Sequence, residues 1–387
     1  MTVTLQLPKG FHAHVTNIGV KDHTDDFTVV AADTVCAAAG VFTQSSFAGP
    51  SVLVSRRHLA SGAARAMVVI SKNANVANGP QGLADAEEVV AGVAGALGCA
   101  ADDVLIASTG VIGRPYPMDR IRAGLAAVPA ALPGTDADAV ARGIMTTDTV
   151  PKTAHATAGA ASVVGVAKGV GMIEPNMATM IAMVFTDAEV SSADLDAMFR
   201  RVVDRTFNCV SVDTDTSTSD TAVVLASGAA GLVAADELED ALRAVCESLT
   251  RQIARDGEGA TTLLAVTVDE ASSHEQARRV AKAIVNSPLV KTAVHGADPN
   301  WGRVAMAVGK STSADEVDQE RVVIRFGTQE VYPATLGDED LAALSEYMRG
   351  DEVRIHVSLA TGGDASATVW GCDLTDGYVR INADYTT

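Results

Sequence analysis

The sequence predicts a mixed α/β protein. Short runs rich in Val, Ile, Leu and Ala recur along the 387 residues, with the length and composition of half-buried or buried strands. Longer segments with the apolar spacing of a helix lie between these runs, and several of them begin with Ser or Asp in a capping position. Strands mixed with helices in this way indicate the α/β class.

The expected elements follow the chain in order. Strands are predicted at residues 27–31, 67–70, 104–107, 181–185, 222–225, 263–268, 322–326 and 353–357. Helices are predicted at residues 84–97, 116–130, 192–206, 236–255, 273–286 and 338–349. Pro288 and Pro299 lie in a stretch of small residues, which indicates a subdomain boundary near residue 288 and a smaller C-terminal α/β subdomain over 288–387.

Charge and composition exclude several classes of protein. Lys and Arg total 29 against 48 Asp and Glu, and the net charge of -19 disfavours binding to nucleic acid or to an anionic membrane. The amino terminus does not resemble a secretory signal, and no run reaches the roughly 18 apolar residues of a membrane span. We therefore expect a cytoplasmic protein.

Metal and disulfide signatures are also missing from the sequence. The five cysteines show no C-x-x-C spacing, so we expect free, buried thiols and no disulfide framework or zinc site. Neither H-E-x-x-H nor G-x-S-x-G occurs, which removes the usual zinc-protease and α/β-hydrolase signatures. The sequence predicts no metal.

The most unusual segment is a glycine-rich stretch that leads into the strand predicted at 181–185. It spans residues 165–180 and contains Lys168, Gly169, Gly171, Pro175 and Thr179. Its spacing matches neither G-x-x-x-x-G-K-[ST] nor G-x-G-x-x-G, so nucleotide binding is disfavoured. From propensity alone, the segment is a glycine-rich turn into a core strand.

A second interpretation applies if the chain is cut before Thr179. A threonine hydroxyl is a weak nucleophile and needs a base within hydrogen-bond reach. An N-terminal threonine carries that base itself, because an α-amino group titrates at about 7.7–8.0. A strained turn at Ala178-Thr179 would allow the hydroxyl to attack the preceding carbonyl, so that self-cleavage creates the catalyst.

At these residues the chain resembles the ornithine acetyltransferases of arginine biosynthesis, also called glutamate N-acetyltransferases. In that family a lysine and glycines precede Met-Ile-x-Pro-x-Met-Ala-Thr-Met, and residues 168–180 match this pattern. Val170 departs from it, because the family usually has a smaller residue there. Further family motifs follow in order at residues 40–43, 73–75, 81–86, 108–113, 144–152, 207–208, 213–221, 258–261, 298–303 and 382–387, with a departure at 76–80.

The resemblance implies a set of site residues. Thr179 would be the nucleophile and, through its α-amino group, the base, while Thr109 and Gly110 would stabilise the oxyanion. The substrate-binding positions of the family match Thr146, Lys168, Thr179, Glu258, Asn382 and Thr387. We infer that Lys168 pairs with a substrate carboxylate and Glu258 with a terminal ammonium, and we favour Thr146 over Thr147. Without the resemblance, 108–110 would be an ordinary turn and Glu258 a solvated helix-end charge.

The resemblance also implies a reaction and an assembly. Self-cleavage between Ala178 and Thr179 would give an α chain, 1–178, and a β chain, 179–387. The enzyme would move the acetyl group of N2-acetyl-L-ornithine to L-glutamate through an acetyl-threonine intermediate, without a cofactor. The implied fold is an N-terminal-nucleophile-like sandwich of sheets between helices, and the implied assembly is an α2β2 heterotetramer.

Two alternatives remain open at this point. The same N-terminal threonine would make an amidohydrolase or aminopeptidase if water captured the acyl-enzyme more readily than an amine. An unprocessed, non-catalytic metabolite-binding protein could also carry the same fold.

Overall fold

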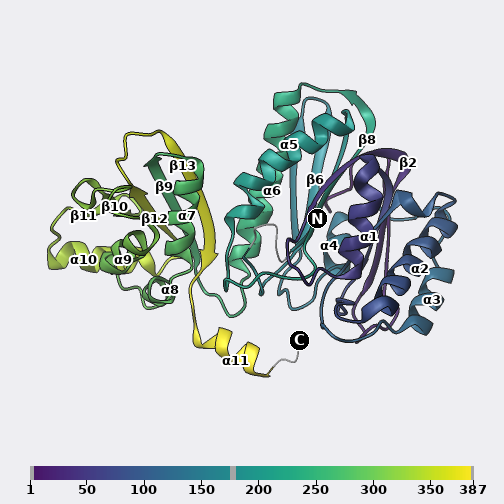
Figure 1. The fold of residues 1–387 in the computed structure, drawn as a ribbon, viewed down its shortest axis with the longest axis horizontal. Coiled ribbons are helices and arrows are strands. Elements are labelled where there is room, and N and C mark those ends of the chain that lie inside the picture. Colours follow the sequence, from purple (N-terminus) through teal and green to yellow (C-terminus); the bar gives the residue numbers. More distant parts are fainter. Residues whose placement is uncertain (1–3, 175–179, 385–387) are drawn as a thin grey trace.

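The protein is a mixed α/β structure with a larger and a smaller unit (Figure 1). The computed structural model describes residues 4–174 and 180–384. Helices of the larger unit are α1 (Pro50–His58), α2 (Gly79–Leu97), α3 (Met118–Ala126), α4 (Ala137–Gly143), α5 (Ser192–Arg205) and α6 (Ala235–Arg255). Its strands are β1 (Phe11–Thr16), β2 (Phe27–Phe42), β3 (Ala63–Ile70), β4 (Val104–Ser108), β5 (Lys152–Ala158), β6 (Ala161–Lys168), β7 (Ile181–Glu189) and β8 (Thr221–Leu232).

The larger unit contains an eight-stranded sheet that bends at β2. The strand order is β4-β3-β2-β8-β7-β6-β5, with β1 also paired to β2. The first part of the 16-residue β2 pairs with β3, and the part from Ala37 to Phe42 pairs with β8. The register between β2 and β3 shifts between Ala31 and Cys36, where the two parts meet. One long strand therefore joins two layers.

The two layers face each other across a shared apolar core. Val30 and Met67 from one layer lie in the same buried cluster as Val166 and Phe185 from the other. The Phe11 and Phe185 rings are 5.1 Å apart between centroids, which is a contact between the layers. Alternate residues of each strand point the opposite way, toward α1, α2 and α3 on one side and α5 and α6 on the other. The expected sandwich of sheets between helices is confirmed.

Helix α6 shows how the apolar pattern of the sequence produces a helix of the outer layer. Its buried residues recur at spacings of three and four, which gives one apolar face along the whole helix: Leu238, Leu242, Val245, Cys246, Leu249 and Ile253. A Cβ at Gly165 of β6 would lie 2.5 Å from Val245 Cγ1 and 2.8 Å from Leu249 Cδ1. Only glycine lets α6 approach the sheet this closely.

The smaller unit is a five-stranded sheet with its own helices. Its strands are β9 (Leu263–Ala271), β10 (Val323–Phe326), β11 (Gln329–Tyr332), β12 (Glu352–Ser358) and β13 (Ala365–Cys372), in the order β11-β10-β12-β9-β13. Its helices are α7 (His274–Val285), α8 (Pro288–His295), α9 (Trp301–Ser311) and α10 (Asp338–Met348). The unit thus includes β9 and α7, which precede residue 288. Its apolar core is continuous with that of α5, α6 and β6–β8.

The last helix returns to the larger unit. After β13, α11 (Asp376–Asp384) leaves the smaller unit and runs beneath the centre of the molecule in Figure 1. No helix in the described part of the chain is long and apolar enough to span a membrane. The cysteines are unpaired, and all except the half-buried Cys99 are buried.

The close packing of α6 gives a stability prediction. We expect Leu249→Ala to lower the free energy of unfolding by about 2–5 kcal/mol, because it leaves a cavity between α6 and the sheet. Leu232→Ala is the matched control, since that leucine is 80% exposed, and it should change the value by less than about 0.5 kcal/mol. Urea denaturation of both variants measures the difference, and equal stability of the two would contradict the assigned core.

Candidate active site

A small polar pocket opens where several strands end. Its volume is about 160 Å³, and its walls come from the loops after β4 and α4, the end of β6, the loop before β8, the turn after α6, and α11. The predicted site residues that line it are Thr109, Gly110, Thr146, Lys168, Glu258 and Asn382. Ala178, Thr179 and Thr387 lie outside the described residues. The fold therefore brings together every predicted site residue that the structure describes.

Thr109 and Gly110 form one wall. The Thr109 N–H donates to the Ile70 carbonyl at 3.1 Å, which continues the pairing of β3 with β4. Gly110 has φ +128°, and a Cβ there would lie 2.3 Å from the Lys72 carbonyl carbon, so the position requires glycine. The Thr109 hydroxyl forms no hydrogen bond with another described residue and is half-buried at the pocket. A hydroxyl and adjacent backbone of this kind suit the stabilisation of an oxyanion.

Lys168 supplies a buried positive charge. Its ammonium lies 4.0 Å from Asp148 Oδ2, and burial lowers its pKa while Asp148 opposes that shift. Lys152 Nζ is 2.8 Å from Asp148 Oδ1 and 2.5 Å from Asp256 Oδ2, and its side chain is fully buried. Burial alone would raise the pKa of Asp148, but Lys168, Lys152 and the Gly169 N–H lower it to about 2. Asp148 is therefore a carboxylate held between two lysines.

Glu258 supplies the opposite charge on another wall. It lies in the turn after α6, where its N–H donates to the Val170 carbonyl at 2.8 Å. The Thr147 hydroxyl donates to Glu258 Oε1 at 3.3 Å and Asn382 Nδ2 donates to Oε2 at 3.0 Å. Glu258 is half-buried and turned into the pocket, so it is not a solvated helix-end charge. Thr146 and Thr147 both line the pocket, and the Thr146 N–H donates to Asp148 at 3.0 Å.

The glycine-rich segment is shaped by these contacts. A Cβ at Gly171 would lie 2.5 Å from the Glu258 carboxyl carbon, so the glycine allows the carboxylate to approach the backbone. The Met172 and Ile173 N–H groups donate to the Asp213 carboxylate at 2.6 and 2.8 Å. Burial raises the pKa of Asp213, and these two donors oppose the shift. Residues up to Glu174 are thus anchored to the loop before β8.

Sequence reasoning missed several buried acids near the pocket. Asp148, Lys152 and Asp256 form the ionic cluster, and the spacing of the first two gave no local signal because no helix covers residues 148–152. Asp220 is buried beside Lys168, and the Met180 N–H, the Thr43 hydroxyl and the Lys168 charge oppose only part of the effect of burial on its carboxyl group. Burial raises the pKa of Asp220 well above its ordinary value. No group of His, Cys, Asp and Glu within residues 4–174 and 180–384 is arranged to hold a metal ion.

The layered fold and a pocket with charges of both signs define an α/β protein with a site for a small polar molecule. The profile of the ArgJ family matches residues 12–387, and the chain belongs to this family. It is 57% identical over 380 residues to the arginine biosynthesis bifunctional protein ArgJ 2 of Nostoc sp., with 98% of each chain covered. It is 54% identical to the glutamate N-acetyltransferase Oat2 of Streptomyces clavuligerus, with 99% of each covered. A solved structure of ArgJ from Bacillus halodurans is 42% identical, with a TM-score of 0.48, and covers 51% of this chain and 96% of its own.

The pKa of Asp148 gives a pH-dependent prediction. Because the folded-state value is about 2, below the ordinary 3.8, the charged form stabilises the fold above pH 3.8, and this contribution is lost as the pH falls toward 2. We expect Asp148→Asn to lower the free energy of unfolding by about 3–5 kcal/mol at pH 7, since it leaves buried lysines uncompensated. The difference from the wild type should shrink as the pH falls below 3.8.

Urea denaturation at several pH values measures this effect. Asp351→Asn is the control, because that carboxylate is 95% exposed in its ion pair with Arg255 and its loss should cost less than about 1 kcal/mol. If Asp148→Asn were as mild as the control at pH 7, the buried ionic cluster would not stabilise the fold.

Proposed function

We propose that this protein is an ornithine acetyltransferase of arginine biosynthesis, which transfers the acetyl group of N2-acetyl-L-ornithine to L-glutamate. The observation that carries the proposal is the convergence of Thr109, Gly110, Lys168 and Glu258 on one pocket, in a chain of the ArgJ family. The family resemblance and the described geometry thus point to the same residues.

The catalyst is created by self-cleavage between Ala178 and Thr179. The cut gives an α chain, 1–178, and a β chain, 179–387, whose first residue carries both a hydroxyl and an α-amino group. The hydroxyl is the nucleophile, and the amine, with an ordinary pKa of about 7.7–8.0, accepts its proton near neutral pH. Asp213 supports this step by anchoring Met172 and Ile173 just before the cleavage segment.

The transfer proceeds in two half-reactions. The Thr179 hydroxyl oxygen attacks the acetyl carbonyl, the amide C–N bond breaks, and the proton taken by the α-amino group passes to the departing nitrogen of ornithine. The amine of glutamate then attacks the acetyl-threonine ester, and the Thr179 oxygen regains a proton as N-acetylglutamate leaves. One amide replaces another, so the reaction needs no cofactor, and its kinetics are ping-pong. Thr109 and Gly110 stabilise the oxyanion in both halves.

Charges in the pocket orient the amino-acid substrates. Lys168 pairs with the substrate carboxylate, and Glu258, held by Asn382, pairs with the terminal ammonium of ornithine. Thr146 and Thr387 complete the proposed binding set, with Thr146 favoured over Thr147 for direct contact. The cleaved chains assemble as an α2β2 heterotetramer, and the protein acts in the cytoplasm. Size-exclusion chromatography of the processed protein tests the assembly.

Processing is the first expected outcome. Intact mass under denaturing conditions should show two fragments that separate between Ala178 and Thr179 in the wild type, and one chain in Thr179→Ala. Thr157→Ala, on β5, is the control and should be cleaved. A single intact wild-type chain would contradict the mechanism and favour a non-catalytic binding protein.

Transfer is the second expected outcome. Processed enzyme given N2-acetyl-L-ornithine and L-glutamate should form N-acetylglutamate and ornithine in equal amounts, with parallel lines in a double-reciprocal plot. Acetate released at the same rate with and without glutamate would instead identify an amidohydrolase.

Substrate charge recognition gives a third outcome. Glu258→Gln should raise the KM for N2-acetyl-L-ornithine by about tenfold or more, because a charge-assisted contact becomes a neutral one. Glu346→Gln is the matched control, since its side chain is 77% exposed on α10, and it should leave the KM unchanged. Equal KM values for the two variants would remove Glu258 from ammonium binding.

A further inference from the structure

We propose that Lys72 is a positioning residue for the Thr109-Gly110 wall, acting through a hydrogen-bonded cluster in the loop between β1 and β2. Lys72 is not among the described residues that line the pocket. The kinetic part of this inference rests on the proposed function, while its structural part stands on the contacts of the described residues alone.

The backbone of Lys72 touches the pocket wall directly. A Cβ at Gly110 would lie 2.3 Å from the Lys72 carbonyl carbon and 2.5 Å from its Cα, so the two backbones are in close contact. The Val111 N–H donates to the Lys72 carbonyl at 3.4 Å, and the Ala74 N–H donates to the Val111 carbonyl at 3.0 Å. Any change in the Lys72 backbone is therefore transmitted to residues 109–111.

That backbone is in a conformation that a side chain disfavours. Lys72 has φ +74°, in the left-handed region, which a lysine rarely adopts. Such strain persists only where the surrounding structure holds it. The local hydrogen bonds of the main chain do not distinguish lysine from any other residue, so the restraint specific to lysine lies in its side-chain contacts.

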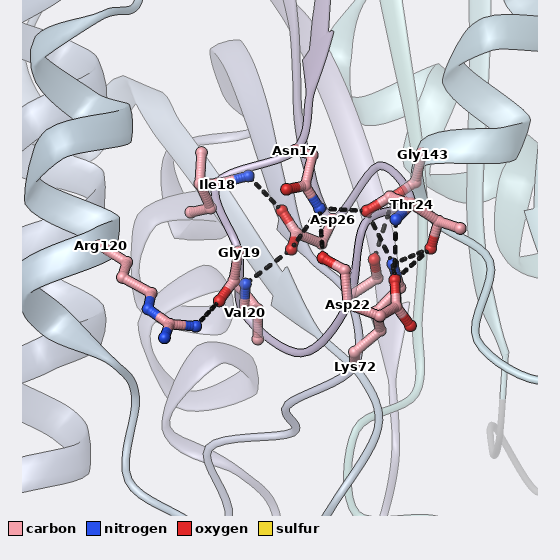
Figure 2. Close-up of polar contacts among 11 residues, drawn as sticks. Asn17, Ile18, Gly19, Val20, Asp22, Thr24, Asp26, Lys72, Arg120 and Gly143 are labelled. Carbon is pink, nitrogen blue, oxygen red and sulfur yellow. Dashed lines mark hydrogen bonds and ion pairs between the residues drawn. The ribbon is translucent and has the colours of Figure 1, made fainter.

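The Lys72 ammonium is fully engaged by the loop between β1 and β2 (Figure 2). Nζ donates to Asp22 Oδ1 at 2.9 Å, to the Thr24 carbonyl at 2.9 Å and to the Thr24 hydroxyl. Hydrogen bonds from Thr24 and Lys72 keep the pKa of Asp22 well below its usual range, so Asp22 faces the ammonium as a carboxylate. Lys72 is 8% exposed, and a nearly buried ammonium is stable only with such partners.

The loop that receives the ammonium is itself fixed. Asp26 is fully buried and accepts from the Ile18 and Val20 N–H groups, each at 2.7 Å, and from Asn17 Nδ2 at 3.1 Å. Arg120 of α3 donates to the Gly19 carbonyl on the other side of the loop (Figure 2). Asn17 Nδ2 also donates to the Asp22 carbonyl at 3.0 Å, so the loop that carries the acceptors is held by contacts other than those of Lys72.

The neighbouring Ser71 extends the same support to a second wall. Its hydroxyl donates to the carbonyl of Gly143, the last residue of α4, at 3.1 Å. Gly143 lies three residues before Thr146, so residues 71 and 72 touch the supports of both pocket loops. The cluster of Asn17, Asp22, Thr24, Asp26 and Lys72 therefore supports the pocket wall that Thr109 and Gly110 form.

Loss of the Lys72 ammonium should lower kcat and leave the KM nearly unchanged. If the ammonium is removed, the Lys72 backbone relaxes from its left-handed conformation and Gly110 shifts with it. Donors to an oxyanion act on charge that develops in the transition state, so a small displacement lowers kcat and changes ground-state binding little. We expect processed Lys72→Met to lose about 10- to 100-fold in kcat, with a KM for N2-acetyl-L-ornithine within about twofold of the wild type.

Two matched variants accompany Lys72→Met. Lys310→Met removes an exposed lysine from α9 and should leave kcat unchanged. Asp22→Asn weakens the acceptor but keeps an oxygen for the ammonium, so its loss in kcat should be smaller and in the same direction. All rates are expressed per processed chain, as measured by intact mass.

Hydrogen exchange measured by mass spectrometry supplies a readout that does not depend on activity. In Lys72→Met, peptides that cover residues 108–113 and 17–26 should exchange faster, while peptides of α6 should exchange as in the wild type and in Lys310→Met. Unchanged kcat, unchanged exchange at 108–113, or equally faster exchange along the whole chain would each overturn the inference. A wild-type protein without transfer activity would refute the proposed function, and the exchange result would still decide the role of Lys72.

Discussion

The buried carboxylate of Asp148 holds together parts of the chain that would otherwise repel. It lies within 4.0 Å of Lys168 at the end of β6 and binds Lys152 at the start of β5, while its oxygens also accept from the Thr146 and Gly169 N–H groups. Without this negative charge, burying two lysines near one pocket would lower the free energy of unfolding. The position of the Lys168 ammonium, and so the positive side of the pocket, depends on it.

Close approach of backbones sets the shape of the pocket. Gly110 lies against Lys72, and Gly171 lies against the Glu258 carboxylate, at distances that no Cβ could occupy. These contacts bring a hydroxyl, an ammonium and a carboxylate together around one cavity. The glycines of the segment at 165–171 therefore allow neighbouring groups to approach the backbone closely, in addition to allowing the chain to turn. This close approach explains why the segment is so rich in glycine, which a turn alone explains only in part.

The smaller unit contributes to the site as well as to the core. Its sheet continues the apolar core of α6, and the chain leaves β13 through α11, which delivers Asn382 to Glu258. Asn382 thereby fixes the carboxylate that the proposed mechanism uses for the substrate ammonium. The described part of the C-terminal region is thus a component of the binding site.

Local pattern determined the α/β class, the helices α2, α5, α6, α7 and α10 and the strands β2–β4, β7–β10 and β12, because apolar periodicity reflects one-sided burial, but it gave no strand at β1, β6, β11 or β13. It missed β5, a half-exposed strand with polar residues, and it assigned a boundary to the segment of α8, where Pro288 in fact occupies the first turn and Ser287 caps it. The motifs also named the pocket residues. Only the tertiary structure decided that β2 bends between two layers, that Lys168 reaches Asp148 and that Lys72 lies against Gly110, because these contacts join residues well separated in the chain and leave no periodic signal.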